Sequence, residues 1–300
     1  MIERLEMFIA LANARHFGHA AEAVGVTQPT LSSAIRQLED QLGVKLVNRG
    51  SRFQGLTPEG ERVLAQALGI VAATRALRDE MRAVRSGLSG DLRIGVIPTA
   101  LPMVVDLVAP YSARYPEVRV QILSRAASEI VDQIDRLQLD AGVTYLDPEP
   151  TRRLTQIPLY RESYELLVSD RDALAKRPSV TWAEVGALPL CLLTRDMQNR
   201  RIIDRHLAAA GRPAAPKVES NSIIVLVSHV ATGRWASVVP AKLAATFVPG
   251  GGLAVVPILG SGDASDQGQL VGLVAAQREP RTPLLEALVE EARRHRTARA

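Results

Sequence analysis

The sequence predicts a protein of the α/β class that begins with an all-α-rich domain. Residues 1–57 carry apolar residues at helical spacing, and residues 58–87 continue as one long helical pattern. From residue 91 onward, short apolar runs typical of strands alternate with helical patterns. The chain has 300 residues, which suits about two domains of ordinary size.

Composition narrows the class of protein. Hydrophobic residues make up 47% of the chain, and the formal net charge of +4 permits an anionic partner without requiring one. One cysteine, Cys191, excludes an internal disulfide and a multi-cysteine metal site, and such usage is typical of the reducing cytoplasm. No signal-peptide pattern and no long uncharged apolar run are present, so we expect a cytoplasmic protein without a membrane span.

Three amphipathic helices are predicted within residues 1–57. Their apolar stripes are Leu5, Phe8, Ile9 and Ala12 in the first, Ala20, Ala21 and Val24 in the second, and Leu31, Ile35, Leu38 and Leu42 in the third. Gly25 should end the second helix, Thr27 should cap the third, and Gly43 should close it. A short helix, a turn with glycine and a longer helix form the helix-turn-helix pattern, whose second helix enters the DNA major groove.

The polar start of the third helix supplies candidate DNA contacts. Gln28 can bond an adenine edge, while carbons of Pro29 and Thr30 can contact thymine methyl groups. Downstream, a Gly-rich hairpin with two arginines would cross the sugar–phosphate backbone as a wing. The candidate DNA-binding residues are Thr27, Gln28, Pro29, Thr30, Ser32, Ser33, Arg36, Arg49 and Arg52. A simple cap followed by a solvated face is the alternative, and the three-helix context with its hairpin disfavours it.

Here the sequence resembles a known family. VTQPTLSSAIRQLEDQLGVKLVNR, followed by LTPEG, is similar to the N-terminal signature of LysR-type transcriptional regulators. The resemblance implies a winged helix-turn-helix, a long dimerising helix and a two-lobed effector domain. It also implies double-stranded operator DNA as a partner, a homodimer or homotetramer, and RNA polymerase as a further possible partner. Ser33 and Val47 depart from the residues common in that family.

The long helical pattern predicts an assembly surface. Val63, Ala67, Ile70, Thr74, Leu77, Met81 and Val84 alternate steps of four and three. Such a heptad seam over a helix of about 40 Å cannot be buried by the helix alone. We therefore expect a partner helix, with packing on the protein's own domain as the alternative. Ser86, Gly87, Ser89 and Gly90 should form a hinge.

The second half predicts two α/β lobes joined by a double crossover, as in periplasmic ligand-binding proteins. Predicted strands are 92–97, 118–123, 141–144, 164–169, 190–193, 217–220, 235–239, 253–258 and 270–276, the last returning to the first lobe, and a helix over 282–296 ends the chain. The domain boundaries expected are 1–57 for the winged domain, 58–87 for the dimerisation helix and 88–300 for the effector domain, with lobe one about 91–160 and 268–300 and lobe two about 161–267.

Polar residues recur where these strands end, and ligands bind at that edge of such sheets. Helix N-termini and hydroxyl groups there favour an anion, most simply a small carboxylate. The candidate effector-binding residues are Pro98, Thr99, Ser128, Thr144, Tyr145, Thr194, Arg195, Asn199 and Asn221. Each Ser or Thr could instead be only a helix cap. LDAGVTYLDPEP also resembles regulators encoded beside formate dehydrogenases, so formate is one candidate effector.

Two other functions remain as alternatives. An enzyme would need a nucleophile elbow, a phosphate loop or paired carboxylates at a recognisable spacing, and none is evident. The five histidines show no metal-ligand spacing, and Cys191 lies in an apolar strand typical of a core, so we expect neither metal nor cofactor. A transport binding protein would share the two lobes, but the N-terminal DNA-binding pattern argues against it.

Overall fold

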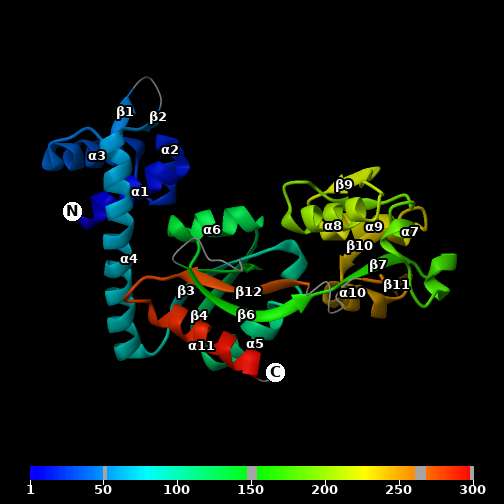
Figure 1. Ribbon diagram of the computed structural model, residues 1–300. Helices are drawn as coiled ribbons and strands as arrows, with labels where there is room; N and C mark the ends of the chain where they lie inside the picture. Colours follow the sequence, from blue (N-terminus) through cyan, green and yellow to red (C-terminus); the bar gives the residue numbers. More distant parts are fainter. Residues whose placement is uncertain (50–52, 147–153, 261–267, 298–300) are drawn as a thin grey trace. The chain divides into compact units, whose positions relative to one another are not determined.

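The computed structural model describes residues 1–49, 53–146, 154–260 and 268–297. The chain divides into two compact units (Figure 1). Unit 1 contains residues 1–89, 135–138 and 278–286, and unit 2 contains 90–134, 139–277 and 287–300. No helix in the described part of the chain is long and apolar enough to cross a membrane.

Unit 1 begins with the three predicted helices. They are α1 (Ile2–Ala14), α2 (Phe17–Ala23) and α3 (Gln28–Leu42). Gly25 has φ +71° and Gly43 has φ +72°, the left-handed conformation that glycine adopts without a Cβ clash. Phe8, Leu31 and Leu38 are fully buried in the core shared by these helices. The helix-turn-helix prediction is therefore confirmed.

The wing is a two-stranded antiparallel hairpin, β1 (Val47–Arg49) and β2 (Phe53–Leu56). A buried carboxylate holds its first strand against α3: Oε1 of Glu39 accepts hydrogen bonds from the backbone N–H groups of Leu46 at 3.0 Å and Val47 at 3.4 Å. On the far side, a Cβ added to Gly60 would lie 2.1 Å from the Leu46 carbonyl oxygen. The glycine of the LTPEG motif is thus required because the next helix touches the wing backbone.

The long helix α4 (Pro58–Ser86) follows the hairpin. Thr57 caps it by accepting from Gly60 N–H at 2.9 Å. Its N-terminal part contributes Ala67 and Val71 to the core of α1–α3. The predicted seam therefore divides: Val63 and Ala67 pack within the chain's own domain, whereas Ile70, Leu77, Met81 and Val84 are exposed.

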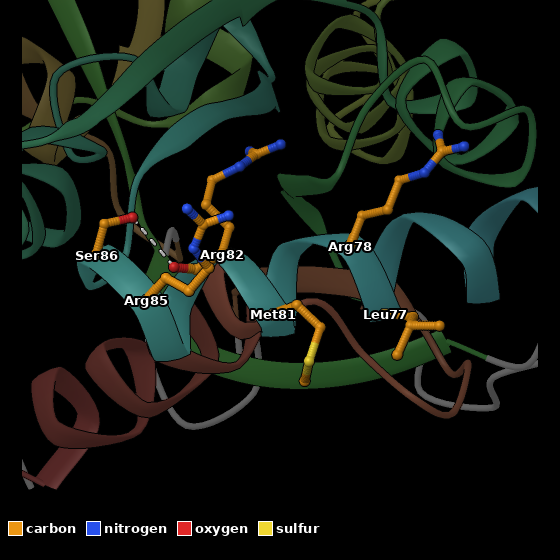
Figure 2. A pocket seen from close by; sticks show the side chains of 6 residues that line it. All are labelled: Leu77, Arg78, Met81, Arg82, Arg85 and Ser86. Atoms are coloured by element: carbon orange, nitrogen blue, oxygen red, sulfur yellow. Dashed lines mark hydrogen bonds between the residues drawn. The ribbon is translucent and has the colours of Figure 1, made fainter.

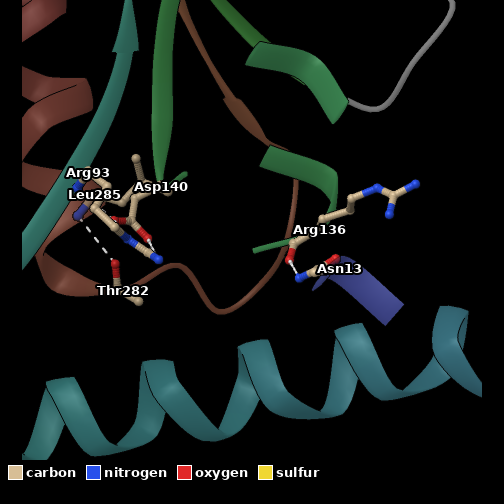
Figure 3. A network of polar contacts seen from close by, with 6 residues as sticks. All are labelled: Asn13, Arg93, Arg136, Asp140, Thr282 and Leu285. Atoms are coloured by element: carbon tan, nitrogen blue, oxygen red, sulfur yellow. Dashed lines mark hydrogen bonds and ion pairs between the residues drawn. The ribbon is translucent and has the colours of Figure 1, made fainter. Parts of the chain in front are cut away.

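Two short segments that lie far along the sequence also belong to unit 1. The Asn13 side-chain amide of α1 donates to the Arg136 carbonyl at 3.3 Å (Figure 3). Leu137, which has φ +59°, packs against the helical core. The Arg278 guanidinium donates to the Asp135 carbonyl at 2.8 Å. The sequence did not predict these contacts, because they join segments more than a hundred residues apart.

The first lobe of unit 2 is built on a five-stranded sheet of order β4-β3-β5-β12-β6. Its strands are β3 (Gly90–Val96), β4 (Val118–Ser124), β5 (Ala141–Tyr145), β6 (Leu154–Glu162) and β12 (Gln269–Ala276). Strands β3, β4 and β5 are parallel, as predicted. Strand β6 was not predicted, and β12 pairs antiparallel with both β5 and β6. This sheet is therefore mixed rather than parallel throughout.

The lobe-one helices are the short 3-10 turn η1 (Pro98–Ala100), α5 (Val105–Arg114), α6 (Ala127–Asp135) and the last helix α11 (Pro283–Thr297). Gly142 of β5 allows α6 to approach the sheet, because a Cβ there would lie 2.2 Å from Ile130 Cγ2. Ser128 is exposed in the first turn of α6, so the predicted helix cap at Ser128 is wrong: the helix begins one residue earlier, at Ala127.

The second lobe has an antiparallel sheet of order β10-β7-β11 and a parallel pair, β8-β9. Its strands are β7 (Tyr164–Ser169), β8 (Cys191–Leu193), β9 (Val218–Ser220), β10 (Ser237–Pro240) and β11 (Leu253–Pro257). Its helical segments are η2 (Ala173–Lys176), α7 (Trp182–Val185), α8 (Gln198–Ala209), α9 (Ile223–Ala231), α10 (Ala241–Phe247) and η3 (Val248–Gly250). Helix α9 packs on β7 and β8.

The chain passes from the first lobe to the second between β6 and β7, with only Ser163 between the two strands. It returns before β12, where Gly268 has φ +57°. A Cβ on Gly268 would lie 2.2 Å from the Glu162 carbonyl oxygen, so the two crossings run in contact. Glu162, the last residue of β6, therefore stands at the junction of the lobes.

Candidate DNA interface and effector site

Helix α3 presents its polar start to solvent. Thr27, Gln28, Pro29, Thr30, Ser33 and Arg36 are exposed, and Ser32 is half-buried. The opposite face of the helix buries Leu31, Ile35 and Leu38 completely. A helix anchored on one side by these apolar residues can present the other side rigidly to a DNA groove, as direct base readout requires.

The capping of α3 fixes the orientation of this face. The Thr27 hydroxyl accepts from the Thr30 backbone N–H at 3.4 Å, and the two threonine hydroxyls lie 2.8 Å apart. Gln28 is not engaged in the cap, so its amide is available to pair with a base. The Ser33 hydroxyl accepts from the Gln37 amide at 3.5 Å.

Two arginines, Arg49 and Arg52, belong to the predicted wing. Arg49 is the last residue of β1, and its partner in the register is Phe53. Arg52 falls within residues 50–52, outside the described part of the chain. The proposed backbone contacts of both residues stay predictions.

A second group of polar residues lies buried where the two lobes meet. We define the interlobe cluster as Thr99, Tyr145, Glu162, Tyr164 and Asn199, each of them buried. Thr99 and Tyr145 come from lobe one, Tyr164 and Asn199 from lobe two, and Glu162 from the crossing. The Tyr145 and Tyr164 hydroxyls donate to the same oxygen, Oε2 of Glu162, at 2.9 and 3.0 Å. Thr99 Oγ1 lies 3.4 Å from the Tyr145 hydroxyl.

Burial dominates the electrostatics of Glu162. Only 2% of the residue is exposed, and removal from water raises the pKa of its carboxyl to about 7 despite the opposing effect of the Tyr145, Tyr164 and Thr99 hydroxyls. No described cationic side chain forms an ion pair with it. Burial and the Glu162 charge also raise the pKa of both tyrosines, so their hydroxyls remain protonated donors.

Several polar atoms in and beside the cluster have no hydrogen-bond partner among the described residues. They are Oε1 of Glu162, Nδ2 of Asn199 and the hydroxyl of Tyr160, which lies next to Glu162, and Oγ1 of Thr144 and of Thr194 is also without a partner elsewhere in unit 2. Buried polar atoms are nearly always hydrogen-bonded, and each exception points to a bound water, ion or ligand. Asn199 is the second residue of α8, whose N-cap, Met197, makes no side-chain cap bond. This region therefore contains one acceptor without a described partner, Glu162 Oε1. It also contains donors without one, namely Asn199 Nδ2 and backbone N–H groups at the start of α8.

The structure brings together some of the predicted effector residues and not others. Thr99, Tyr145 and Asn199 belong to the cluster, and Pro98 is buried beside Thr99. Thr144 precedes Tyr145 in β5, so its side chain points to the opposite face of the sheet. Thr194 directly follows β8, and its carbonyl accepts a hydrogen bond from the Met197 N–H. Ser128, Arg195 and Asn221 are exposed, with no described bond to the cluster.

Sequence reasoning missed Glu162 and Tyr164. All five residues of the run YRESY are polar or aromatic, without the alternation of a strand, so an acid in this run is expected to be exposed to solvent. The missing signal was strand β6: once Glu162 ends a strand that leads directly into β7, its side chain must lie at the lobe junction.

The single cysteine is a core residue. Cys191 is fully buried in β8, and burial raises the pKa of its thiol to about 11. Its Sγ donates to the Leu226 carbonyl at 3.7 Å. The described residues hold no group of three or more His, Cys, Asp or Glu side chains suited to a metal ion.

The exposed end of α4 forms a separate surface. A hollow of about 690 Å³ is lined by Leu77, Arg78, Met81, Arg82, Arg85 and Ser86. Figure 2 shows Leu77 and Met81 pointing away from Arg78, so the helix has an apolar and a basic side here. Leu77 is 57% exposed and Val84 77% exposed, which is unusual for aliphatic side chains on one stripe.

A helix-turn-helix with an outward reading face, joined to two lobes around a buried polar site, defines a DNA-binding regulator with a small-molecule domain. The chain belongs to the LysR family of transcriptional regulators. The model "Bacterial regulatory helix-turn-helix protein, lysR family" matches residues 2–61, and "LysR substrate binding domain" matches residues 85–297.

Individual relatives agree with this assignment. The HTH-type transcriptional regulator IlvR of Caulobacter vibrioides is 32% identical over 247 residues, covering 81% of this chain and 83% of the relative. The dual regulator OxyR of Escherichia coli K12 is 30% identical over 241 residues, covering 80% and 79%. These relatives regulate transcription, which confirms the prediction that the chain is not an enzyme.

Solved structures agree as well. A full-length OxyR variant from Pseudomonas aeruginosa superposes with a TM-score of 0.75 at 27% identity, covering 98% of this chain and 94% of that one. CbnR in complex with its target DNA gives a TM-score of 0.63 at 23% identity, covering 98% and 99%. At that identity, the likeness to CbnR supports the fold alone.

Proposed function

We propose that this LysR-type regulator reads double-stranded operator DNA with α3 and the wing, and that a small carboxylate-bearing effector binds at the interlobe cluster. The observation that carries the effector site is the group of buried, unpartnered polar atoms between the lobes. The carboxylate would accept from Asn199 Nδ2 and from free N–H groups at the start of α8. Thr99 would add a hydroxyl from the other lobe. Formate stays one candidate.

Thiol-based peroxide sensing is the second candidate function, because several relatives are named hydrogen peroxide-inducible genes activators. Redox-sensor cysteines are accessible, have a lowered pKa and often lie beside a resolving cysteine. Cys191 is buried, the pKa of its thiol is raised, and the 300-residue sequence holds no second cysteine. These properties disfavour the candidate for this chain.

We propose further that α4 pairs with a second copy of the chain through Ile70, Leu77, Met81 and Val84, giving a homodimer or homotetramer that can engage RNA polymerase in the cytoplasm. Leu77→Asp would place a charge in that seam, which is costly without a partner. Sedimentation should show a smaller species, while Arg75→Asp, on another side of the helix, serves as the control. An unchanged oligomer in Leu77→Asp would exclude this seam.

The central experiment is a gel shift on the DNA upstream of the protein's own gene. The full chain should retard this DNA more strongly than a scrambled fragment, and a panel of small carboxylates should alter the shift. Thr99→Val and Asn199→Leu should keep DNA binding and lose the response, by about ten- to a hundredfold in effector affinity for each charge-assisted bond. Arg195→Ala is the matched exposed control. If both cluster variants respond like the parent, the effector binds elsewhere.

A further inference from the structure

Resting on the proposed function, the polarity of the interlobe cluster restricts which carboxylate the site takes. The region contains donors at the start of α8 and an acid, Glu162, on the crossing between the lobes. A molecule bearing only a carboxylate would satisfy the donors and leave Glu162 Oε1 unpartnered. It would also bring a second negative charge into a site where no described cation forms an ion pair with Glu162. The site therefore lacks the charge balance that a bare anion requires.

The arrangement around Glu162 leaves one direction open for a ligand. Both tyrosine hydroxyls bond Oε2, one from each lobe, while Oε1 has no described partner although the residue is only 2% exposed. An acceptor that is held in place by two donors, with its second oxygen unused, is preorganised to receive an N–H group. The Asn199 side chain neighbours the Tyr145 hydroxyl, but its Nδ2 forms no hydrogen bond of normal geometry with a described residue, so it can meet an acceptor on a ligand.

We infer that the effector is an amino acid-type zwitterion, whose ammonium group donates to Oε1 of Glu162 while its carboxylate accepts from Asn199 and the start of α8. Such a ligand carries both charges, so it pairs the acid and the donors in one binding event. It would also connect the lobes, because its two ends contact the crossing and lobe two, while Thr99 approaches from lobe one.

The titratable groups next to Glu162 determine how binding should respond to pH. They are Tyr145 on β5, Tyr160 on the same strand as Glu162, and Tyr164 on β7, and all three keep their protons because burial raises the pKa of each. On α10, Lys242 Nζ lies 4.3 Å from the centre of the Tyr160 ring. Glu162 is therefore the group in this set that changes charge near neutral pH, since burial raises its carboxyl pKa to about 7.

The test uses the full chain and calorimetry with each of the twenty L-amino acids as probes. For the tightest binder, two analogues are then measured: the acid that lacks the amino group and the amine that lacks the carboxylate. Each analogue should bind about ten- to a hundredfold more weakly than the amino acid. Glu162→Gln should lose a similar factor toward the amino acid and little toward the deaminated acid. Glu165→Gln, a half-buried acid three residues further on, is the control.

The pH profile separates binding from a merely structural role. Affinity for the amino acid should rise up to about tenfold per pH unit until pH 7 and then level off, because ionised Glu162 is the binding form. In Glu162→Gln the profile should be flat.

Two outcomes would overturn the inference. If a deaminated acid binds as tightly as its amino acid and weakens as pH rises through 7, the effector is a plain anion bound to protonated Glu162; the proposed carboxylate site then stands without the zwitterion. If no amino acid binds while the Trp182 and Trp235 fluorescence shows a folded domain, the zwitterion is wrong, and the gel shift decides the regulator function independently.

Discussion

The start of α3 and the interlobe cluster both gather polar residues, but they do so under opposite conditions. On α3 the polar side chains are exposed, and the apolar residues beneath them are completely buried. In the cluster the polar side chains are themselves buried, and some of their atoms lack partners. The polar side chains of α3 stay hydrated in the absence of DNA, so exposing them carries no desolvation penalty. The polar side chains of the cluster are kept from water by the folded structure. The free energy of unfolding should therefore change when Glu162 is protonated or when a ligand binds.

The largest expected effect lies in the cluster. Since the pKa of Glu162 is raised from 4.5 to about 7, its contribution to stability is complete below about pH 4.5 and is lost as pH rises through 7. The free energy of unfolding of the wild type, relative to Glu162→Gln, should fall by about 3 kcal/mol over that interval. Both tryptophans, Trp182 and Trp235, lie in unit 2, so their fluorescence in denaturant follows this domain.

The control for this measurement is Glu117→Gln, which removes an exposed acid from the same unit. It should not change the pH dependence. A wild type and a Glu162→Gln variant whose stabilities run parallel from pH 5 to 8 would show that Glu162 stays ionised throughout, which would contradict the burial argument.

A buried acid also serves the winged domain, but with every oxygen used. Glu39 accepts two backbone N–H groups and pairs with Lys45 at 3.2 Å. Glu39→Ala would leave the N–H groups of Leu46 and Val47 buried without a partner, at a cost of about 1–3 kcal/mol. Hydrogen exchange followed by mass spectrometry should show faster exchange over residues 44–49. Asp40→Ala, the exposed neighbour, should not; equal protection in both variants would remove Glu39 as the anchor of the wing.

The contrast between the exposed face of α3 and the buried cluster also explains which features could be predicted from the sequence. Helices α1 to α4, their caps and the exposed face of α3 follow from local periodicity, because each helix shows its buried stripe within its own residues. The strands of the lobes were found where they form apolar runs. Glu162 was not found, because its burial depends on β6 pairing with β12 more than a hundred residues later. Thr99, Tyr145 and Asn199 were identified because each follows or ends a recognisable element.

A smaller effect is expected where the protein meets base edges. Gln28→Ala would remove the proposed contact with adenine, a type of contact that discriminates between bases by about 1–3 kcal/mol. Binding to the cognate operator should weaken accordingly, while binding to random DNA changes little and the fold is unaffected, because Gln28 is exposed and makes no cap bond. Fluorescence anisotropy with both DNAs measures this. Equal losses on the two DNAs would mean that Gln28 contacts the backbone and not a base.

The smallest effect belongs to the wing. Arg49 is the last residue of β1, and a wing arginine that bonds phosphate releases counterions without reading sequence. Arg49→Ala should therefore weaken cognate and random DNA by the same factor and lower the slope of log affinity against log salt by about one. Anisotropy titrations at several salt concentrations give that slope, and Arg52→Ala offers an independent second case. Arg75→Ala, on α4 away from the reading helix, controls for the loss of one positive charge from the domain. A loss confined to the operator, with an unchanged salt slope, would assign Arg49 to a base instead and would make the wing, like α3, a source of specificity.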